Sequence, residues 1–295
     1  MKYIFGRGKL SMNSKIQDIK SYQDGLNKNL NDKIDFFINE IDNDIDYIID
    51  FGSANGSLIQ EVIKSHDNIK VVCIDNNRKM RKLCYENMKE YKQFIGVYHS
   101  LKSFERHYSI NYEKAVIILS SVVHELFYYL TESKAKKLLY DIFNKGFNKI
   151  IIRDMSVYSN TDIIFNEKCR YYKEFYDKIN KEVYLNEAWK YYLKKCNINE
   201  IKLYDVIQFL LKYQYSDPSK NLIANWEREC KENYFPLKYE ELRKMYMSFE
   251  KSYDISYEQR YIPDFIYHSV LEDFKIDLKD LTHYKLIFSK DNIKS

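Results

Sequence analysis

Glycine and proline are scarce in this chain: its 295 residues include only 7 glycines and 3 prolines. Average proteins contain about 7% glycine and about 5% proline, and turn-rich β-sandwiches use both residues at their tight turns. The scarcity therefore argues against a β-sandwich and favours long helices. It also makes each glycine informative, because the few that are present stand where the backbone needs them.

Paired cysteines and long apolar runs are also missing. The five cysteines include no C-x-x-C pair, so neither a disulfide framework nor a zinc site is indicated, and we expect no metal ion. No segment approaches the roughly 20 apolar residues of a membrane span. The first residues lack the apolar stretch of a secretory signal. We therefore expect a soluble, cytoplasmic protein without a membrane partner.

The charge balance is mild, with a net charge of +4 and a sequence pI near 8.5. A dedicated nucleic-acid binder more often has a higher pI and clustered basic residues. Hydrophobic residues make up 45% of the chain and aromatic residues 16%, which excludes a disordered protein. Because tyrosines can stack on bases, nucleic acid stays open as a partner.

The periodicity of the apolar residues predicts an α/β protein. Up to about residue 155, segments of strand length alternate with segments whose apolar residues repeat at helical spacing. Such βαβ units form a doubly wound parallel sheet. The strands predicted in this part lie at 46–50, 69–74, 94–98, 115–119 and 149–153.

The pattern changes after the fifth predicted strand. It is helical only from about residue 160 to residue 250, and strand patterns return at 253–261 and 283–288. The sheet is therefore expected to have seven strands, with a large helical insertion between the fifth and the sixth. We divide the chain into an N-terminal helical region (1–45), a Rossmann-like core (46–155), a helical insertion or substrate lid (156–250) and a final segment that completes the sheet (251–295).

The most informative segment is the loop after the first strand, where the sequence reads Asp50-Phe51-Gly52-Ser53-Ala54-Asn55-Gly56. A glycine at each end lets the backbone pass close beneath a ligand. The next helix directs its free N–H groups at the same place. Asp75 ends the second strand, 75 − 52 = 23 residues beyond Gly52, where an acid in such folds accepts ribose hydroxyls. The segment therefore predicts an adenosine-binding site.

This segment resembles the first motif of the class I S-adenosylmethionine (SAM)-dependent methyltransferases, acidic-x-Gly-x-Gly-x-Gly, with Ala54 in place of the middle glycine. The resemblance covers roughly residues 45–155 and resumes at 253–290. It implies SAM as the cofactor, the strand order of that family and an antiparallel last strand. It also implies that Asp50 and the loop hold the methionine part and Asp75 the ribose.

The cofactor site is expected to extend beyond this loop. The family usually presents an acid or a polar residue to the adenine after the third strand, and here His99 and Ser100 stand there. We prefer Ser100, and a surface loop residue is the alternative. The predicted cofactor-binding residues are Asp50, Gly52, Ser53, Ala54, Asn55, Gly56, Asp75, Asn76, Ser100 and Ser120.

A dinucleotide site is an alternative interpretation of the same loop. Nicotinamide enzymes use G-x-G-x-x-G, and this loop has a glycine at only the first of those three positions. A structural loop without any ligand is the remaining alternative. The order of strand, loop, helix, strand and acid favours the methyltransferase.

Candidate catalytic residues follow the fourth predicted strand, in Ser120-Ser121-Val122-Val123-His124-Glu125. Ligands of doubly wound sheets bind outside the carboxyl ends of the strands. The segment resembles the Ser-x-x-x-His-Glu stretch of some small-molecule and uncharacterised viral or phage-type methyltransferases. We predict that His124 and Glu125 are catalytic, as a base or by orienting the acceptor. A histidine that caps the next helix, or one that is satisfied in a polar pocket, is the alternative for His124.

The predicted substrate-binding residues are Ser121, Arg153, Trp226 and Tyr234. Arg153 ends the fifth strand, where an ion pair with Asp154 is the alternative. Trp226 is expected to share one side of a helix with Glu229 and Asn233, where packing in the core is the alternative. No Asn/Asp-Pro-Pro-aromatic motif follows the fourth strand and no Pro-Cys pair is present, which argues against amino- and C5-methylating DNA enzymes.

The sequence thus predicts a SAM-dependent methyltransferase whose acceptor is a small molecule or a nucleic acid. A catalytically inactive methyltransferase-fold subunit, serving as an accessory or binding nucleic acid, is the first alternative. A nucleotide-dependent oxidoreductase is the second.

Overall fold

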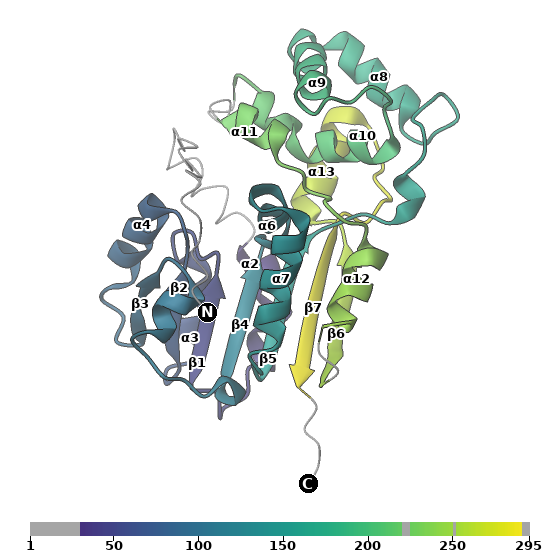
Figure 1. The fold of residues 1–295 in the computed structure, drawn as a ribbon. Helices are drawn as coiled ribbons and strands as arrows, with labels where there is room; N and C mark the ends of the chain where they lie inside the picture. Colours follow the sequence, from purple (N-terminus) through teal and green to yellow (C-terminus); the bar gives the residue numbers. More distant parts are fainter. Residues whose placement is uncertain (1–29, 220–224, 250–251, 291–295) are drawn as a thin grey trace.

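The computed structural model of the chain describes residues 30–219, 225–249 and 252–290. Its centre is a seven-stranded sheet in the order β3-β2-β1-β4-β5-β7-β6, with helices on both faces (Figure 1). Strands β1 to β5 pair in parallel, and β7 runs antiparallel to both β5 and β6. The predicted seven-stranded doubly wound sheet and its antiparallel last strand are confirmed.

The strands lie where the apolar runs predicted them, each bound within two residues. They are β1 (Tyr47–Phe51), β2 (Lys70–Ile74), β3 (Phe94–Tyr98), β4 (Ala115–Ser120), β5 (Lys149–Met155), β6 (Tyr253–Tyr261) and β7 (His283–Lys290). In β4, Ile118 faces one layer of helices, and its neighbours Ile117 and Leu119 face the other. Burial on both faces explains why these strands read as unbroken apolar runs.

Helices of the first half of the chain cover the two faces of the sheet. Helices α3 (Ser57–Ser65) and α4 (Arg78–Met88) pack on one face through residues such as Ile59 and Met88. Helices α5 (Leu101–Glu105) and α7 (Glu132–Phe143) pack on the other through residues such as Phe104 and Leu139. Between β4 and α7 stands the short helix α6 (Val123–Tyr129), which begins directly behind the strand end.

The predicted helical insertion between β5 and β6 is present. Helices α8 (Tyr172–Lys181), α9 (Val183–Lys195), α10 (Leu203–Lys212) and α11 (Trp226–Lys231) enclose a second hydrophobic core, which lies beyond one end of the sheet (Figure 1). Aromatic side chains such as Phe175, Trp189 and Phe209 fill this core.

Two helices pack against a different part of the fold from the one expected from their position in the sequence. Helix α12 (Tyr239–Met247) precedes β6, yet its residues Leu242 and Tyr246 pack on the sheet. Helix α13 (Asp264–Phe274) follows β6, yet Val270 packs in the core of the insertion. The sheet and the insertion are thus interlocked, and the boundaries that we assigned to them from the sequence stay a prediction.

The described part of the N-terminal region, residues 30–45, contains less helix than expected. Residues 1–29 of the predicted helical region lie outside the described residues. Between residues 30 and 45 there are one turn of helix, α2 (Leu30–Ile34), and a 3-10 turn. The apolar residues that suggested one amphipathic helix, among them Ile34 and Phe37, are still buried against the layer of α3 and α4.

None of the helices in the described ranges has both the length and the apolar character needed to cross a membrane.

Candidate functional site

The glycine loop between β1 and α3 adopts a left-handed backbone at three positions. Gly52 has φ +89° and Gly56 has φ +81°, a region that disfavours a Cβ atom. Ala54 has φ +45°, so the residue in place of the middle glycine also accepts the left-handed region. A Cβ on Gly52 would lie 2.8 Å from Val122 Cγ2. The loop therefore lies directly against the segment that follows β4.

Asp75 joins this loop to the end of β2. Its Oδ2 accepts a hydrogen bond from the Ala54 N–H at 3.0 Å, and its Oδ1 accepts one from the Asn77 N–H at 2.7 Å. Burial raises the pKa of Asp75. Because a carboxylate has about four lone-pair sites, both oxygens keep capacity for a ribose hydroxyl. The predicted acid thus stands beside the predicted loop.

A second acid, Asp50, lies in β1 directly before the loop and is 2% exposed. Burial and the nearby charge of Asp75 raise the pKa of Asp50 to about 7, while the ammonium of Lys33 lowers it. Burial in turn lowers the pKa of Lys33, on α2, to about 8. Asp50 is therefore a buried carboxyl group, and its ionised form is stable only beside a cation.

Two hydroxyl oxygens at the ends of β1 and β4 are buried without a partner. Ser53 Oγ and Ser120 Oγ make no hydrogen bond within the part of the chain that the structure describes. Buried polar groups are normally hydrogen-bonded, so each of these hydroxyls is a place for a bound water or ligand. Together with the left-handed loop and the acids Asp50 and Asp75, these hydroxyls fit a polar ligand such as the adenosyl cofactor.

Two other predicted cofactor residues, Asn55 and Ser100, accept hydrogen bonds from the backbone, and a third, Asn76, is exposed. Asn55 Oδ1 accepts the Ser57 N–H at 3.2 Å. Ser100 caps α5, since its Oγ accepts the Ser103 N–H at 3.2 Å. Asn76 is exposed after β2. The contact of Ser100 with an adenine stays a prediction.

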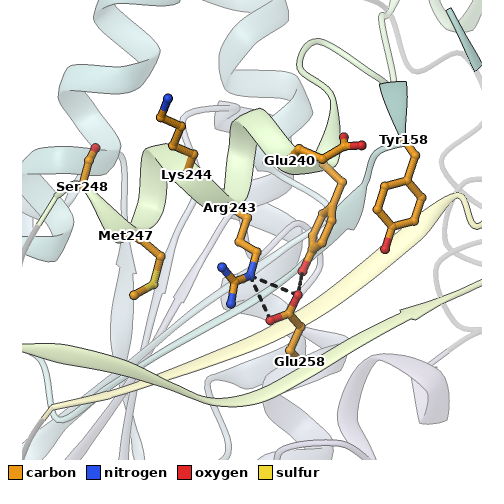
Figure 2. Close-up of a pocket in the computed structure, with 8 residues that line it drawn as sticks. Tyr158, Glu240, Arg243, Lys244, Met247, Ser248 and Glu258 are labelled. Atoms are coloured by element: carbon orange, nitrogen blue, oxygen red, sulfur yellow. Dashed lines mark hydrogen bonds and ion pairs between the residues drawn. The ribbon is translucent and has the colours of Figure 1, made fainter. Parts of the chain in front are cut away.

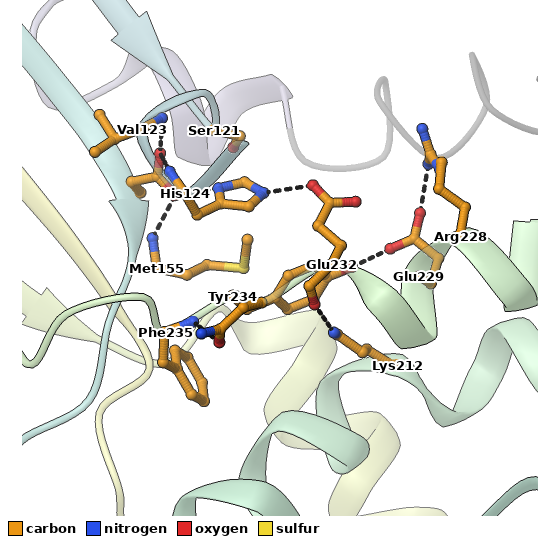
Figure 3. Close-up of polar contacts among 12 residues, drawn as sticks. Ser121, Val123, His124, Met155, Lys212, Arg228, Glu229, Glu232, Tyr234 and Phe235 are labelled. Carbon is orange, nitrogen blue, oxygen red and sulfur yellow. Dashed lines mark hydrogen bonds and ion pairs between the residues drawn. The ribbon is translucent and has the colours of Figure 1, made fainter. Parts of the chain in front are cut away.

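His124 is the first-turn residue of α6 and is only 4% exposed. Its Nδ1 lies 2.5 Å from Asp154 Oδ1, and its Nε2 lies 3.1 Å from Glu232 Oε1 (Figure 3). Burial lowers the pKa of His124, but the carboxylates of Asp154 and Glu232 outweigh it and raise this pKa well above its usual range. The imidazole thus connects the sheet to the insertion.

Asp154, at the end of β5, holds this histidine in place. Its Oδ2 accepts the N–H groups of Val123 at 2.5 Å and His124 at 3.3 Å, and its Oδ1 accepts that of Met155 at 2.7 Å. The carboxylate therefore satisfies free donors at the start of α6. Burial opposes ionisation of Asp154, but His124 holds its pKa below the usual value.

The alternative of an ion pair between Arg153 and Asp154 is wrong. Neighbouring residues of a strand point to opposite faces of the sheet. Arg153 Nη2 instead binds Asp32 Oδ2 of α2 at 2.9 Å, and Lys285 Nζ binds Asp32 Oδ1 at 2.8 Å. Arg153 Nη1 also donates to Ser121 Oγ at 2.9 Å. The structure thus brings together two predicted substrate residues, Ser121 and Arg153, with an N-terminal acid that the sequence did not suggest.

Glu125 follows His124 and is half-buried. Burial raises its pKa to about 8, and the charge of Glu232 adds to this rise. Its carboxylate makes no hydrogen bond or ion pair with any other described residue. One donor atom from each of His124, Glu125 and Glu232 lies within 4.8 Å of the others. The two predicted catalytic residues are thus brought together with a third residue, the acid Glu232 from the insertion.

Tyr234 belongs to this site and Trp226 does not. The Tyr234 ring meets the His124 ring edge to face, at 5.4 Å between centroids. Trp226 packs in the core of the insertion, where its ring centroid lies 6.2 Å from that of Phe209. This agrees with the alternative that Trp226 is a core residue. Helix α11 ends at Lys231, so the expectation that Asn233 shares a helix face with Trp226 is wrong.

A buried polar network fixes the segment that carries Glu232 and Tyr234. Lys212 Nζ donates to the carbonyl oxygen of Glu232 and lies 4.1 Å from the Tyr234 ring centroid. Burial lowers the pKa of Lys212 to about 8. The Tyr234 hydroxyl donates to Glu229, as Figure 3 shows. Sequence reasoning missed Lys212 and Glu232, because no local motif connects α10 or the end of α11 to α6.

A separate hollow of about 660 Å³ lies between α12 and β6 (Figure 2). Its lining includes Tyr239 and Arg243, which both bind the carboxylate of Glu258. None of the predicted site residues lines it, so this hollow is distinct from the candidate site.

Comparisons with known proteins support the fold. No family model matches the chain, and no curated protein sequence matches it. The plantazolicin methyltransferase BamL, solved in complex with a triazolic desmethylPZN analog and SAH, superposes with a TM-score of 0.50. The match covers 92% of this chain and 89% of BamL, at 9% identity. The fold is the Rossmann-like methyltransferase fold.

Two further solved structures are similar at lower TM-scores. PKMT2 from Rickettsia typhi, in complex with AdoHcy, has a TM-score of 0.46 at 8% identity and covers 85% of this chain and 50% of its own. The MccD protein has a TM-score of 0.46 at 10% identity and covers 88% of this chain and 96% of its own. These scores add nothing to the assignment, which rests on the sheet order and on BamL and concerns the fold alone.

Proposed function

We propose that the chain is a SAM-dependent methyltransferase. The observation that carries the proposal is the group at the carboxyl ends of β1, β2 and β4. There the left-handed loop 52–56 is bonded to Asp75 and adjoins the unpartnered hydroxyls of Ser53 and Ser120. Doubly wound sheets bind ligands at this edge. The similarity of the fold to BamL supports the same conclusion.

Each group in the site has a role in this proposal. SAM would supply a methyl group already activated by its sulfonium. Asp50 and the glycine loop would hold the methionine part and Asp75 the ribose. His124 and Glu125, behind the end of β4, would contact the acceptor and orient its attacking atom. Such positioning can lower a barrier by about 7–11 kcal/mol in well-oriented systems.

Ligand-dependent thermal stability tests the cofactor assignment. A ligand that binds only the folded chain raises its melting temperature by mass action. We expect S-adenosylhomocysteine (SAH) to raise Tm and NAD and NADP to leave it unchanged. Stabilisation by a dinucleotide alone would support the oxidoreductase instead, and no stabilisation by SAH would contradict the proposal.

Replacing Asp75 by alanine should weaken SAH binding strongly. A hydrogen bond to a charged group contributes about 1.5–3 kcal/mol, so Kd should rise roughly 10- to 150-fold in calorimetric titration. Asp67→Ala is the matched control, because Asp67 is exposed on the turn before β2 and should leave Kd unchanged. An equal Kd for Asp75→Ala and wild type would exclude Asp75 from the ribose site.

Binding of SAH should weaken as the pH falls below 7. Asp50 has its pKa raised to about 7, so below that pH it is protonated and no longer attracts the ligand ammonium. For one linked proton, affinity should fall by roughly a factor of ten per pH unit below the pKa. Calorimetry between pH 5.5 and 8 measures the slope. In Asp50→Asn the slope should disappear; an unchanged slope would assign the effect to another group.

The acceptor proposed from the sequence, a small molecule or a nucleic acid, stays a prediction, as do the cytoplasmic location and the kinship with viral or phage-type enzymes. Incubation with methyl-labelled SAM and separate metabolite and RNA fractions distinguishes the two acceptor classes. Tight SAH binding without transfer to either fraction would favour the inactive accessory subunit.

A further inference from the structure

Three side chains with metal-binding atoms meet between the sheet and the insertion. His124 and Glu125 come from the first turn of α6, and Glu232 follows α11. Their donor atoms lie within 4.8 Å of one another, and Nε2 of His124 is 3.1 Å from Glu232 Oε1. Small changes in side-chain torsion would bring all three to bonding distance of one ion. The set therefore has the spacing of a metal site.

The imidazole is oriented as in metal-binding histidines. Such a histidine commonly donates its second ring N–H to a carboxylate, which fixes the ring and its tautomer. Here Asp154 accepts at Nδ1, and Asp154 is itself fixed by the backbone N–H groups of Val123 and Met155. The Nε2 atom is therefore the one directed at Glu232 (Figure 3).

The two glutamates have one paired cation between them, since Glu232 Oε1 lies 3.1 Å from His124 Nε2. Glu125 makes no hydrogen bond or ion pair within the described ranges, although it is half-buried. Lys212 directs its Nζ to the backbone carbonyl oxygen of Glu232. Arg228 forms an ion pair with Glu229. Charges removed from water are normally paired or bound to metal, and a metal ion would satisfy both acids.

We propose that His124, Glu125 and Glu232 bind one divalent transition-metal ion. An imidazole combined with carboxylates suits Zn²⁺ and Mn²⁺. Three protein ligands leave a coordination position for water or an acceptor atom, as in catalytic zinc sites. Since Glu232 belongs to the insertion and His124 to helix α6 behind the sheet, the ion would also join these two parts of the fold. From the sequence we expected no metal ion, and Glu232 was not considered there as a ligand.

Calorimetric titration tests this site without any methyl transfer. The chain is stripped with EDTA, desalted and titrated with ZnCl₂ or MnCl₂; we expect one ion per chain. Glu125→Gln and Glu232→Gln should each weaken binding at least tenfold. Glu227→Gln is the matched control, because Glu227 lies on α11 with its side chain 59% exposed and should bind as wild type. The proposal would be overturned if the wild type bound no ion, or if Glu125→Gln and Glu232→Gln bound the ion as tightly as the wild type.

A measurement on the wild-type chain covers the case in which a variant does not fold. Pulsed electron paramagnetic resonance of bound Mn²⁺ should show modulation from one histidine nitrogen, which His124→Gln removes. Bound Mn²⁺ without nitrogen modulation would contradict the site. SAH titration of the same samples keeps the two proposals separate, since loss of the ion should leave the glycine loop and Asp75 able to bind SAH.

Discussion

Asp154→Ala should lower the free energy of unfolding by about 3–5 kcal/mol, the usual cost of removing one partner of a buried ion pair. Asp154 is fully buried and is the partner of His124 Nδ1. Its loss would leave Nδ1 of the charged imidazole without its partner and the N–H groups of Val123 and Met155 without this acceptor. Urea denaturation followed by circular dichroism measures the change.

An exposed ion pair provides the control for this result. Asp141 binds Lys137 at 3.1 Å on the surface of α7, where the two side chains are 50% and 67% exposed. Pairs of this kind contribute about 0.3–0.5 kcal/mol. If Asp141→Ala cost as much as Asp154→Ala, the network around His124 would not be a stabilising centre.

Gly52→Ala should cost about 2–5 kcal/mol of stability and weaken SAH binding. A left-handed non-glycine residue costs about 1–2 kcal/mol, and overpacking adds about 1–3 kcal/mol. Both apply here, because Gly52 has φ +89° and its new Cβ would lie 2.8 Å from Val122 Cγ2. The same urea experiment, with SAH titration beside it, measures both effects.

Gly146→Ala separates the two contributions. Gly146 also has a left-handed backbone, at φ +77°, but the nearest atom to a new Cβ would be the mobile end of Lys290, at 3.6 Å. Only the backbone term should remain, about 1–2 kcal/mol. Equal losses for Gly52→Ala and Gly146→Ala would mean that the loop does not press against the segment after β4.

The sheet and the glycine loop could be predicted because their signals are local. Strands buried on both faces are written as unbroken apolar runs, such as Ala115–Leu119. A left-handed turn needs glycine or a small residue, and Gly52, Ala54 and Gly56 mark it. In each case the residue type and the conformation concern the same few positions of the chain.

The charged part of the site could not be found in this way. Asp154 and His124 are 30 residues apart and meet only because β4 and β5 are neighbours in the sheet. Glu232 reaches them from the insertion. One signal was available for Asp154: the alternation of side chains along a strand already separates it from Arg153. Nothing in the sequence around Glu232 or Lys212 indicates their partners.

The carboxylate of Asp32, on α2, determines how far the chain can be shortened at its N-terminal side without loss of buried ion pairs. It forms ion pairs with residues of two strands, Arg153 of β5 and Lys285 of β7. Both of these side chains are almost entirely shielded from solvent. A fragment that starts at the first strand would lack Asp32. The side chains of Arg153 and Lys285 would then lose this counter-ion, and their two positive charges would remain close to each other. The residues from Asp32 onward that precede β1 are thus held against β5 and β7, in part through this one carboxylate.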